Sequence, residues 1–315
     1  MLRLILARFA GFGLTLVAVS AAIFLVLDVL PGDPAAIMLG TSAREDTLAA
    51  LRAELGLDRP ALARYLDWVS GLATGDLGTS TTYHVPVAGL VAERLAVTLP
   101  LALLALALVA ALALPLGLAA ASRRGRWADR AVMVFSQLGV ALPNFWIGLL
   151  LVLAFATGLR WFPAGGFPGW GAGLGAGLHA LVLPAIALAL PQAAVLARVT
   201  RSSALEVVGQ DFARTARAKG LDPGAVLRRH VAPNALIPVL TILGLQFSFL
   251  VAGAVLVETV FNLPGLGRLA HQALAQRDLP VIRTVVLLLA ALVIAVNGLV
   301  DLLQLLVDPR LRGLR

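Results

Sequence analysis

The residues best suited to binding chemistry lie in one polar, basic stretch, DFARTARAKGLDPGAVLRRHVAP, which runs from Asp211 to Pro233 between two long apolar segments. Three cations, Arg214, Arg217 and Lys219, gather in its first half. The rest of the chain is typical of the body of a membrane channel or carrier. The stretch therefore predicts a surface that a soluble partner binds, and a solvated loop is the alternative.

Catalytic and metal sites are not indicated by the sequence. No carboxylate pair, histidine cluster or Ser/His set has the placement of a catalytic site. The four histidines are scattered and cysteine is absent, so we expect no metal or disulfide in this chain. A Walker A loop needs Gly-Lys followed by Ser or Thr, whereas the one lysine, Lys219, precedes Gly220. We therefore expect no cofactor in this chain.

The composition indicates an integral membrane protein of the all-α class. Of the 315 residues, 60% are hydrophobic and 13% are charged, and the mean hydropathy is +0.93. A soluble domain carries about 25% charged residues. The net charge of +8 is typical, in so apolar a chain, of positively charged cytoplasmic loops. We therefore expect a lipid bilayer as partner and no nucleic acid.

Six apolar segments are long enough to cross a bilayer, since about 20 apolar residues span its hydrocarbon core. They are Phe9–Leu30, Ala96–Ala121, Ala131–Gly158, Leu178–Ala197, Asn234–Val257 and Thr284–Val307. The first is too long for a signal peptide and lacks an A-x-A cleavage site, so we expect a retained helix. The pair Pro143-Asn144 is a candidate break in the third span.

The distribution of basic residues predicts the orientation. Loops 1–8, 122–130, 198–232 and 308–315 hold 16 basic residues, and the opposite loops hold 9 although they are longer. By the positive-inside rule the first set is cytoplasmic. We therefore expect a multi-pass protein of a bacterial-type cell membrane, with both termini in the cytoplasm.

The region between the first two spans, residues 31–95, is expected on the external side. Two amphipathic helices are predicted within it, one over Thr47–Leu55 that Gly56 ends and one that starts at Pro60. The region is more typical of a cap on the helix bundle than of a separate domain. We therefore expect one transmembrane domain over residues 1–315.

The basic stretch belongs to a predicted cytoplasmic loop at residues 198–233. Asp211 is a suitable N-cap for a first short helix, and Gly220 suits the left-handed position after its end. Asp222-Pro223 is typical of the cap and first turn of a second helix. Pro233 marks the expected start of the next membrane helix. The loop is therefore predicted to form two short helices at an elbow.

This loop resembles the EAA loop of ABC importer permeases, in which E-A-A precedes three residues, Gly, nine residues, Ile, one residue and Leu-Pro. Gly220 and Pro233 take the glycine and final proline places at the expected spacing. Arg214-Thr215-Ala216 stands for E-A-A, and His230 and Ala232 replace Ile and Leu. These departures resemble the dipeptide/oligopeptide/nickel branch, whose loops read D-(Y/F)-x-R-T-A-R-A-K-G-L.

Further motifs extend the resemblance from about Pro31 to Arg310. They are GDLGTS at Gly75–Ser80, PNFWIG at Pro143–Gly148, WFPAGG at Trp161–Gly166, ETVFNLPGLG at Glu258–Gly267 and RDLP at Arg277–Pro280. The resemblance implies the type I ABC importer permease fold with six transmembrane helices. It also implies an external region between helices one and two, and cytoplasmic coupling helices between helices four and five.

The same resemblance implies partners. A second homologous permease subunit, an extracytoplasmic solute-binding protein and one or two ATP-binding subunits that hold ATP and Mg²⁺ would complete the system. The elbow would dock on an ATP-binding subunit through Asp211, Ala213, Arg214, Ala216, Arg217, Lys219 and Gly220. We expect Ala213 and Ala216 to allow close approach, Gly220 to permit the turn, and the cations to add charge complementarity.

Polar residues in or near the spans are further candidates. For the pathway they are Asn144, Gln246, Asn297 and Asp301. For the external gate or the binding protein they are Glu258 and Asp278. Interhelical hydrogen bonds, pairing of Asp301 with an arginine, and surface ion pairs of Glu258 and Asp278 are the alternatives.

The predicted function is the permease subunit of an ATP-driven importer that works by alternating access. Di- or oligopeptides are the expected cargo, and nickel or glutathione are alternatives. ATP hydrolysis is expected in partner subunits, so this chain is not expected to be an enzyme. A stand-alone secondary transporter or channel is the main rival, but it needs an ion or proton relay for which only Asp301 is available. An integral membrane enzyme would need a catalytic set.

Overall fold

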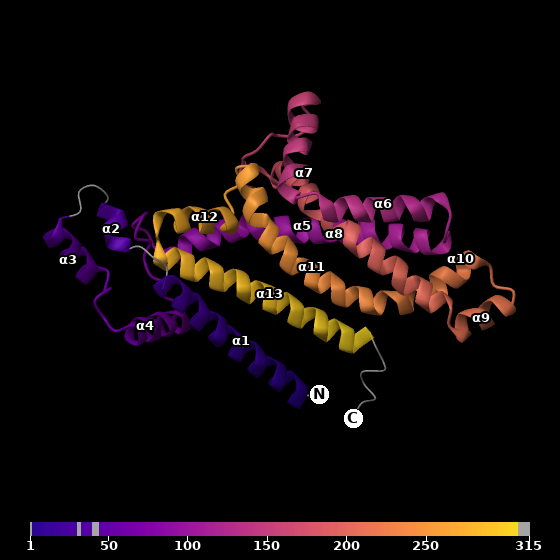
Figure 1. The fold of residues 1–315 in the computed structure, drawn as a ribbon, viewed down its shortest axis with the longest axis horizontal. Coiled ribbons are helices and arrows are strands. Elements are labelled where there is room, and N and C mark those ends of the chain that lie inside the picture. The colour runs from indigo at the N-terminus through magenta and orange to yellow at the C-terminus, as the bar shows by residue number, and fades with distance from the viewer. Residues whose placement is uncertain (1, 30–32, 40–43, 308–315) are drawn as a thin grey trace. The chain divides into compact units, whose positions relative to one another are not determined.

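The computed structural model describes residues 2–29, 33–39 and 44–307, most of which are helical (Figure 1). The α-helices are α1 (Leu2–Val29), α2 (Pro34–Leu39), α3 (Glu45–Glu54), α4 (Ala61–Thr74), α5 (Val87–Ser122), α6 (Trp127–Ala141), α7 (Asn144–Leu151), α8 (Leu174–Val208), α9 (Asp211–Ala218), α10 (Pro223–Val226), α11 (Ala232–Val260), α12 (Leu266–Gln276) and α13 (Leu279–Val307). Within the described residues, one π-helical stretch, Val152–Gly158, follows α7 and another, Leu227–Val231, follows α10. A 3₁₀ turn, Trp170–Ala172, lies between the first of these and α8. Within the described ranges, β-structure is limited to one antiparallel bridge between Thr79 and Pro86.

The chain divides into two compact units, each with its own packing. The first unit comprises residues 1–97 and 265–295, and the second comprises residues 98–264 and 296–315. Helices α5 and α13 contribute residues to both units. The single transmembrane domain expected over the whole chain stays a prediction.

In the first unit, α3 and α4 confirm the two helices predicted in residues 31–95. Gly56 follows the end of α3 with a φ of +65°, and Pro60 is the N-cap of α4. Helix α4 packs against α1, where the hydroxyl oxygens of Ser20 and Tyr65 lie 3.0 Å apart. Local turn signals were sufficient to place both helices because glycine and proline act on the backbone directly.

A hydrophobic core joins α5, α12 and α13 within the first unit. Its buried members include Val87, Val91, Leu266, Leu269, Val281 and Val285. Because these residues are packed in the core, two helices begin earlier than the sequence predicted. Helix α5 begins at Val87 rather than at the predicted Ala96, and α13 begins at Leu279 rather than at Thr284.

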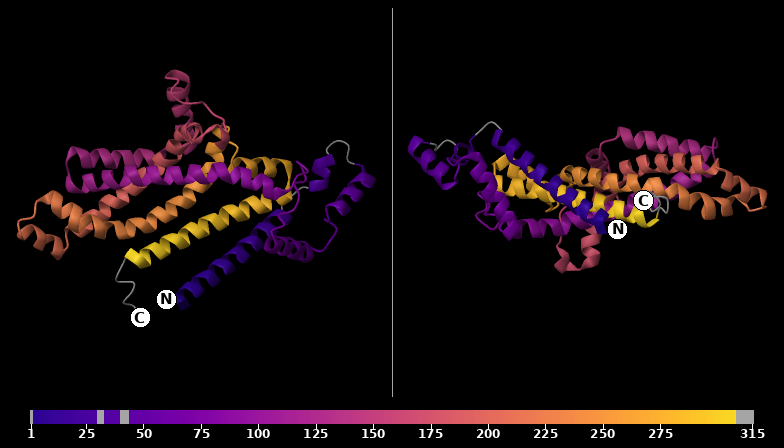
Figure 2. Two further views of the ribbon diagram at one scale, coloured as in Figure 1. Left: turned by 180° about the vertical axis from the view of Figure 1, so that it is seen from behind. Right: turned by 90° about the horizontal axis from the view of Figure 1, so that it is seen from below.

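In the second unit, α8 is the central helix. It packs against α6, α7 and α11, and both views in Figure 2 show α8 and the orange α11 side by side. Most of its buried residues are alanine or leucine. Small side chains let helix backbones approach closely, which is a common basis of helix association in membranes.

Helix α8 also continues beyond its predicted end at Ala197. Residues 198–208 contain neither glycine nor proline, and the helix ends at Val208, directly before Gly209. The first third of the loop predicted at residues 198–233 is therefore helical. The polar residues that suggested a loop are tolerated because a helix satisfies its own backbone groups wherever it leaves the membrane.

Among the described residues, five helices are long and apolar enough to cross a membrane. The predicted third span is a bent pair, α6 and the α7 segment, with 103° between its two parts. The break lies at Leu142-Pro143, one residue before the predicted pair Pro143-Asn144, because proline lacks an N–H and disfavours helix at the residue before it. Counted as one span, this pair brings the number to six.

Candidate functional site

The predicted docking loop forms a short amphipathic helix, α9, followed by a tight turn into α10. Helix α9 begins at Asp211 with Gln210 as its N-cap, so the N-cap role predicted for Asp211 is wrong by one residue. Asp211 lies in the first turn instead. A carboxylate is favourable there because the helix dipole is positive at its N-terminus.

Ala213 and Ala216 attach α9 to the rest of the second unit. Both are buried in a core that also contains Ala204, Val226 and Ala235. We expected these alanines to let a partner approach, but they face the chain's own helices. Their small side chains therefore allow α9 to lie close to α8 and to the start of α11.

The other face of α9 is exposed and basic. Phe212 is 39% exposed, and Arg214, Arg217 and Lys219 are also exposed. The Arg217 guanidinium donates a hydrogen bond from Nη2 to the carbonyl oxygen of Val208, at 3.1 Å. This face therefore offers an aromatic ring and three cations. Aromatic and arginine side chains often contribute most of the binding energy at protein interfaces.

The turn after α9 follows the prediction closely. Gly220 has a φ of +81°, in the left-handed region that glycine adopts without steric cost. The Asp222 carboxylate caps α10 by accepting hydrogen bonds from the N–H groups of Gly224, at 3.1 Å, and Ala225, at 2.9 Å. Both hydrogen bonds lower the pKa of the Asp222 carboxyl below its ordinary value of 3.8, and the bond from the Gly224 N–H has the larger effect. The cap is therefore ionised at neutral pH.

Helix α10 does not end before the next membrane helix. A π-helical stretch, Leu227–Val231, joins it to α11, and one helical run extends from Pro223 to Val260. Helix α11 itself begins at Ala232, one residue before the predicted start at Pro233. Pro233 lies in the first turn of α11, where its missing N–H is tolerated. A force on α10 would consequently act on α11 without an intervening loop.

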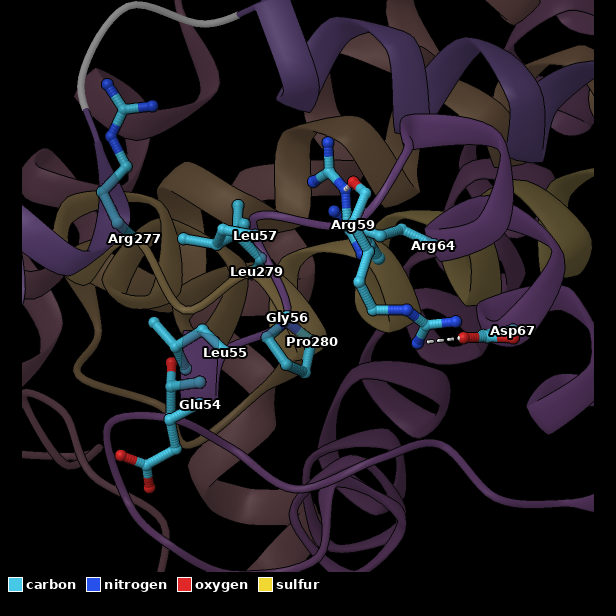
Figure 3. A pocket seen from close by; sticks show the side chains of 12 residues that line it. Glu54, Leu55, Gly56, Leu57, Arg59, Arg64, Asp67, Arg277, Leu279 and Pro280 are labelled. Carbon is cyan, nitrogen blue, oxygen red and sulfur yellow. Dashed lines mark hydrogen bonds and ion pairs between the residues drawn. The ribbon is translucent and has the colours of Figure 1, made fainter. Parts of the chain in front are cut away.

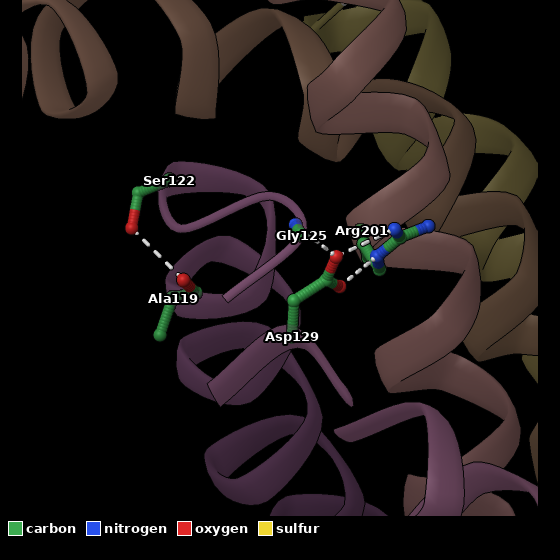
Figure 4. Close-up of polar contacts among 5 residues, drawn as sticks. All are labelled: Ala119, Ser122, Gly125, Asp129 and Arg201. Carbon is green, nitrogen blue, oxygen red and sulfur yellow. Dashed lines mark hydrogen bonds and ion pairs between the residues drawn. The ribbon is translucent and has the colours of Figure 1, made fainter. Parts of the chain in front are cut away.

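A buried ion pair ties α6 to α8 (Figure 4). Asp129 is 4% exposed, and its carboxylate accepts hydrogen bonds from Nε and Nη2 of Arg201. The Gly125 N–H also donates to this carboxylate, at 2.8 Å. The pair therefore fixes the turn between α5 and α6 to the part of α8 that leads into α9. Sequence analysis missed this pair.

Two pathway candidates, Asn144 and Gln246, lie at helix contacts in the second unit. Asn144 starts α7 beside Gly253 of α11, where an added Cβ would overlap the Asn144 amide. Gln246 is two turns away on α11 and is 3% exposed, and its Oε1 has no hydrogen-bond partner among the described residues. A buried amide oxygen without a donor is costly, so Gln246 remains a pathway prediction.

The other two pathway candidates, Asn297 and Asp301, lie on α13. Asn297 is half-buried and Asp301 is exposed. Nearby, Gln304 Nε2 donates to Thr241 Oγ1 of α11 at 2.5 Å. This part of α13 therefore meets α11, and a pathway role for Asn297 and Asp301 stays a prediction.

Glu258 is buried, contrary to the expectation of an external contact or a surface pair. Its side chain is fully buried in the second unit, and Thr98 Oγ1 donates to its Oε1 at 2.6 Å. The hydrogen bond joins α11 to α5, and it explains how a carboxylate can be accommodated there. Direct contact with a binding protein would require this side chain to move.

Asp278 is also fully buried, so it does not contact a partner as the chain is folded here. Its carboxylate accepts hydrogen bonds from the Ser80 hydroxyl and from the N–H groups of Thr82, at 3.1 Å, and Val281, at 3.3 Å. The first two donors belong to the loop before α5, and the third belongs to the first turn of α13. Asp278 therefore clamps the loop before α5 to α13.

Replacing Asp278 by asparagine is expected to lower the free energy of unfolding by about 1–3 kcal/mol, because the amide would turn a donor toward the donors of the loop. Thermal unfolding of the detergent-solubilised chain measures the change. Asp46→Asn is the matched control, because the Asp46 side chain is 75% exposed. An unchanged midpoint for Asp278→Asn would contradict the clamp.

The histidines do not form a metal site within the part of the chain that the structure describes. No group of three or more His, Asp or Glu side chains there is placed to hold a metal ion. His179 stacks on Phe162, with ring centres 4.8 Å apart, and its Nε2 lies 3.0 Å from the carbonyl oxygen of Trp161. This histidine therefore supports the loop that carries the WFPAGG motif.

Two family models match this chain in adjoining parts. Residues 113–313 match the binding-protein-dependent transport system inner membrane component. Residues 1–102 match the N-terminal region of the membrane component of binding-protein-dependent transport systems. Together the two matches cover nearly the whole sequence.

Curated relatives align with this chain from end to end. A putative peptide transport system permease protein of Brucella abortus is 45% identical over 99% of both chains. A probable peptide ABC transporter permease protein of Sinorhizobium fredii is 41% identical over 98% of both. A glutathione transport system permease protein of Salmonella choleraesuis is 38% identical over 99% of both. Among solved structures, the crystal structure of an amino acid ABC transporter with histidines matches 69% of this chain and 93% of that chain, with a TM-score of 0.48 and 20% identity.

Proposed function

Because this chain belongs to the family of inner membrane components of binding-protein-dependent transport systems, we propose that it forms one half of the pathway of an ATP-driven importer of short peptides. The chain is a permease component, and the family match confirms the predicted fold class, an all-helical membrane permease of the type I importer kind. The proposed cargo is supported by the printed names of relatives, two for peptide transport and one for glutathione, which is itself a tripeptide.

The observation that carries the proposal is the exposed face of α9. Two of the alanines of α9 are buried in the chain's own core, so the aromatic ring and the cations are the groups of α9 that remain accessible to a partner. The chain has no Walker A lysine of its own, so ATP and Mg²⁺ are bound by the partner. In our proposal, Phe212, Arg214, Arg217 and Lys219 contact this ATP-binding subunit, and Asp211 and Gly220 shape the helix that presents them.

Coupling is proposed to follow the helices that hold α9. The helix is packed on α8 through Ala213 and Ala216, and α10 continues into α11. When the ATP-binding subunits close, α9 and α10 move with them, and α8 and α11 move as their rigid extensions. Transport then follows a population shift between inward-open and outward-open states, driven by their different affinities for the partners.

The remaining partners and the orientation belong to the same proposal. A second homologous permease forms the other half of the pathway, and a solute-binding protein delivers the peptide on the external side. Both termini lie in the cytoplasm, as the excess of basic residues in their loops favours. Asn144, Gln246, Asn297 and Asp301 are proposed to border the pathway.

Replacing Phe212 by aspartate is expected to weaken binding of the ATP-binding subunit about tenfold, because an exposed aromatic contact is lost and a like charge faces a carboxylate-bearing partner. The measurement is retention of the ATP-binding subunits by the affinity-purified permease pair, followed by ATP-dependent uptake of a labelled tripeptide into vesicles that contain the whole system.

Arg44→Glu is the control, because its side chain is 82% exposed and belongs to the external region. This variant should retain the ATP-binding subunits. Full retention by the Phe212→Asp variant would contradict the docking proposal. Uptake that needs an ion gradient and no ATP would support the secondary-transporter alternative, and uptake of glutathione in preference to other tripeptides would narrow the cargo.

A further inference from the structure

A basic cleft of about 340 Å³ lies in the first unit, between α3, α4 and the start of α13. Its charged lining residues are Arg59, Arg64, Arg277, Arg283, Glu54 and Asp67. Figure 3 shows Arg59 paired with Asp67, and their side-chain atoms lie 2.5 Å apart. Arg64 pairs with Asp28 of α1 at 2.6 Å. Because arginines outnumber carboxylates in the lining, the cleft is suited to an anion.

An apolar groove of about 390 Å³ lies in the same unit, between α1, α4 and α13. Leu16 and Val17 of α1, Leu72 of α4, and Leu287 and Leu288 of α13 are among its walls. Helices α1 and α13 are candidate membrane spans, so hydrocarbon chains surround these walls in the membrane. Cleft and groove each have a volume typical of ligand sites, which is about 300–1,000 Å³.

The cleft and the groove adjoin on two helices. On α4, Asp67 lines the cleft and Val69 lines the groove, two residues apart. On α13, the neighbours Arg283 and Thr284 line the cleft and the groove respectively. A ligand with a charged head and an apolar tail would therefore find both environments within one turn of each helix.

Buried donors without acceptors gather at this junction. Trp68 Nε1, Arg283 Nε and Thr284 Oγ1 have no hydrogen-bond partner among the described residues, and Thr284 is only 4% exposed. The Arg283 guanidinium carbon lies 4.7 Å from the ring centre of Phe24 and 5.9 Å from that of Trp68. Unsatisfied buried polar groups are rare in native proteins, and a cluster of them indicates a missing acceptor.

We propose that this junction binds one anionic phospholipid, with its phosphate at Arg283 and Arg64 and an acyl chain in the groove. A phosphodiester brings acceptor oxygens to the donors of Arg283 and Thr284, which line the cleft and the groove, and a negative charge to the arginines, whose planar guanidinium groups suit phosphate. The acyl chain fills the groove between α1, α4 and α13. The lipid thereby joins the external helix α4 to two membrane helices.

Other occupants account for only half of the site. A soluble anion such as inorganic phosphate satisfies the arginines but leaves the apolar groove without a ligand. A zwitterionic lipid fills the groove, but its choline cation is repelled by the excess of arginines in the cleft. The combination of an arginine-rich cleft and an apolar groove therefore selects a lipid with net negative charge.

The test measures thermal unfolding of the purified full-length chain in detergent micelles, with phosphatidylglycerol, phosphatidylcholine or inorganic phosphate added. Phosphatidylglycerol is expected to raise the unfolding midpoint in a concentration-dependent way, because a ligand that binds only the folded state stabilises it. Arg283→Gln is expected to weaken this effect about tenfold in lipid concentration, and Ala291→Phe, which fills the groove, by a similar factor. Arg44→Gln is the matched control and should respond as the native chain does, because its side chain is 82% exposed.

Equal stabilisation by phosphatidylcholine or by inorganic phosphate would overturn the proposal. So would an unchanged response to phosphatidylglycerol in the Ala291→Phe variant, which decides the question even if Arg283→Gln fails to fold. Quenching of Trp68 fluorescence by phosphatidylglycerol with brominated acyl chains provides a second measurement. The quenching should fall in Trp68→Phe, and a fully retained signal would contradict the location of the site.

Discussion

Replacing Asp129 by alanine is expected to lower the free energy of unfolding by about 3–5 kcal/mol, because it leaves a largely buried arginine without its counter-charge. Asp129 is 4% exposed and accepts two hydrogen bonds from Arg201 and one from the Gly125 N–H. Its loss also releases the turn between α5 and α6. We therefore expect a lower thermal midpoint of the solubilised chain.

A double variant separates the charge effect from lost packing. Replacing a buried ion pair by apolar residues of similar volume is often neutral or even stabilising, whereas removal of one partner is costly. The Asp129→Leu and Arg201→Met double variant should therefore be more stable than Asp129→Ala alone. An equal loss of stability in Asp129→Ala and in the double variant would show that the unpaired charge of Arg201 is not the cause of the destabilisation. Asp46→Ala, at a side chain that is 75% exposed, should leave the midpoint unchanged.

The functional consequence of this substitution follows from the position of the pair. Arg201 lies on the part of α8 that leads into α9, whose exposed face is the proposed docking surface. If α6 no longer holds α8, movement of α9 is transmitted less completely to the helix bundle. We therefore expect the Asp129→Ala complex to hydrolyse ATP with weaker stimulation by the loaded binding protein, measured in vesicles at a temperature where the variant is folded.

Much of the fold follows from local signals in the sequence. Gly220, Asp222 and Pro60 each act on the backbone next to them, so their positions predicted the turn after α9, the cap of α10 and the start of α4. Apolar length predicted the spans, and Pro143 predicted the break in the third. The N-cap of α9 was misplaced by one residue because Gln210 and Asp211 are adjacent polar residues at the same boundary.

The buried polar contacts could not be predicted, because their partners are distant in the sequence. Arg201 lies 72 residues from Asp129, Glu258 lies 160 from Thr98, and Asp278 lies 198 from Ser80. No spacing rule connects such pairs. One signal was present, since Asp129 is the one acidic residue in an arginine-rich turn, but its partner depends on how α8 packs.

The docking residues show the same division. The small side chains of Ala213 and Ala216 predicted a close contact, but the sequence did not predict which neighbour covers their face of α9. The chain's own core covers it, so the exposed cations are the groups that we propose for contact with a partner. The spacing of residues along a helix predicts which side chains share a face. Tertiary packing determines whether that face is buried in the chain or accessible to a partner.

Replacing Gly139 by leucine is expected to lower the free energy of unfolding by about 3 kcal/mol, because the new side chain would occupy space that α8 already fills. A Cβ added at Gly139 would overlap the Cβ of Ala194. The buried residues of α6 are Asp129, Val132, Ser136 and Gly139, which form one stripe at helical spacing. Gly139 therefore sets the closest approach of α6 to α8 at the far end of the stripe from the Asp129 ion pair.

Gly298→Leu on α13 is the matched control, because an added Cβ there meets no atom within 4 Å. Both variants gain the same side chain in a membrane helix, so a selective loss at Gly139 reports helix contact rather than the change of residue type. Thermal unfolding of the solubilised chain measures the difference, and equal midpoints would contradict the close contact of α6 and α8. Gly139 and Asp129 are ten residues apart on α6, which is about 15 Å at the helical rise, and they contact different residues of α8. Combined with Asp129→Ala, Gly139→Leu should therefore cost about the sum of the two single variants, as expected for separate sites.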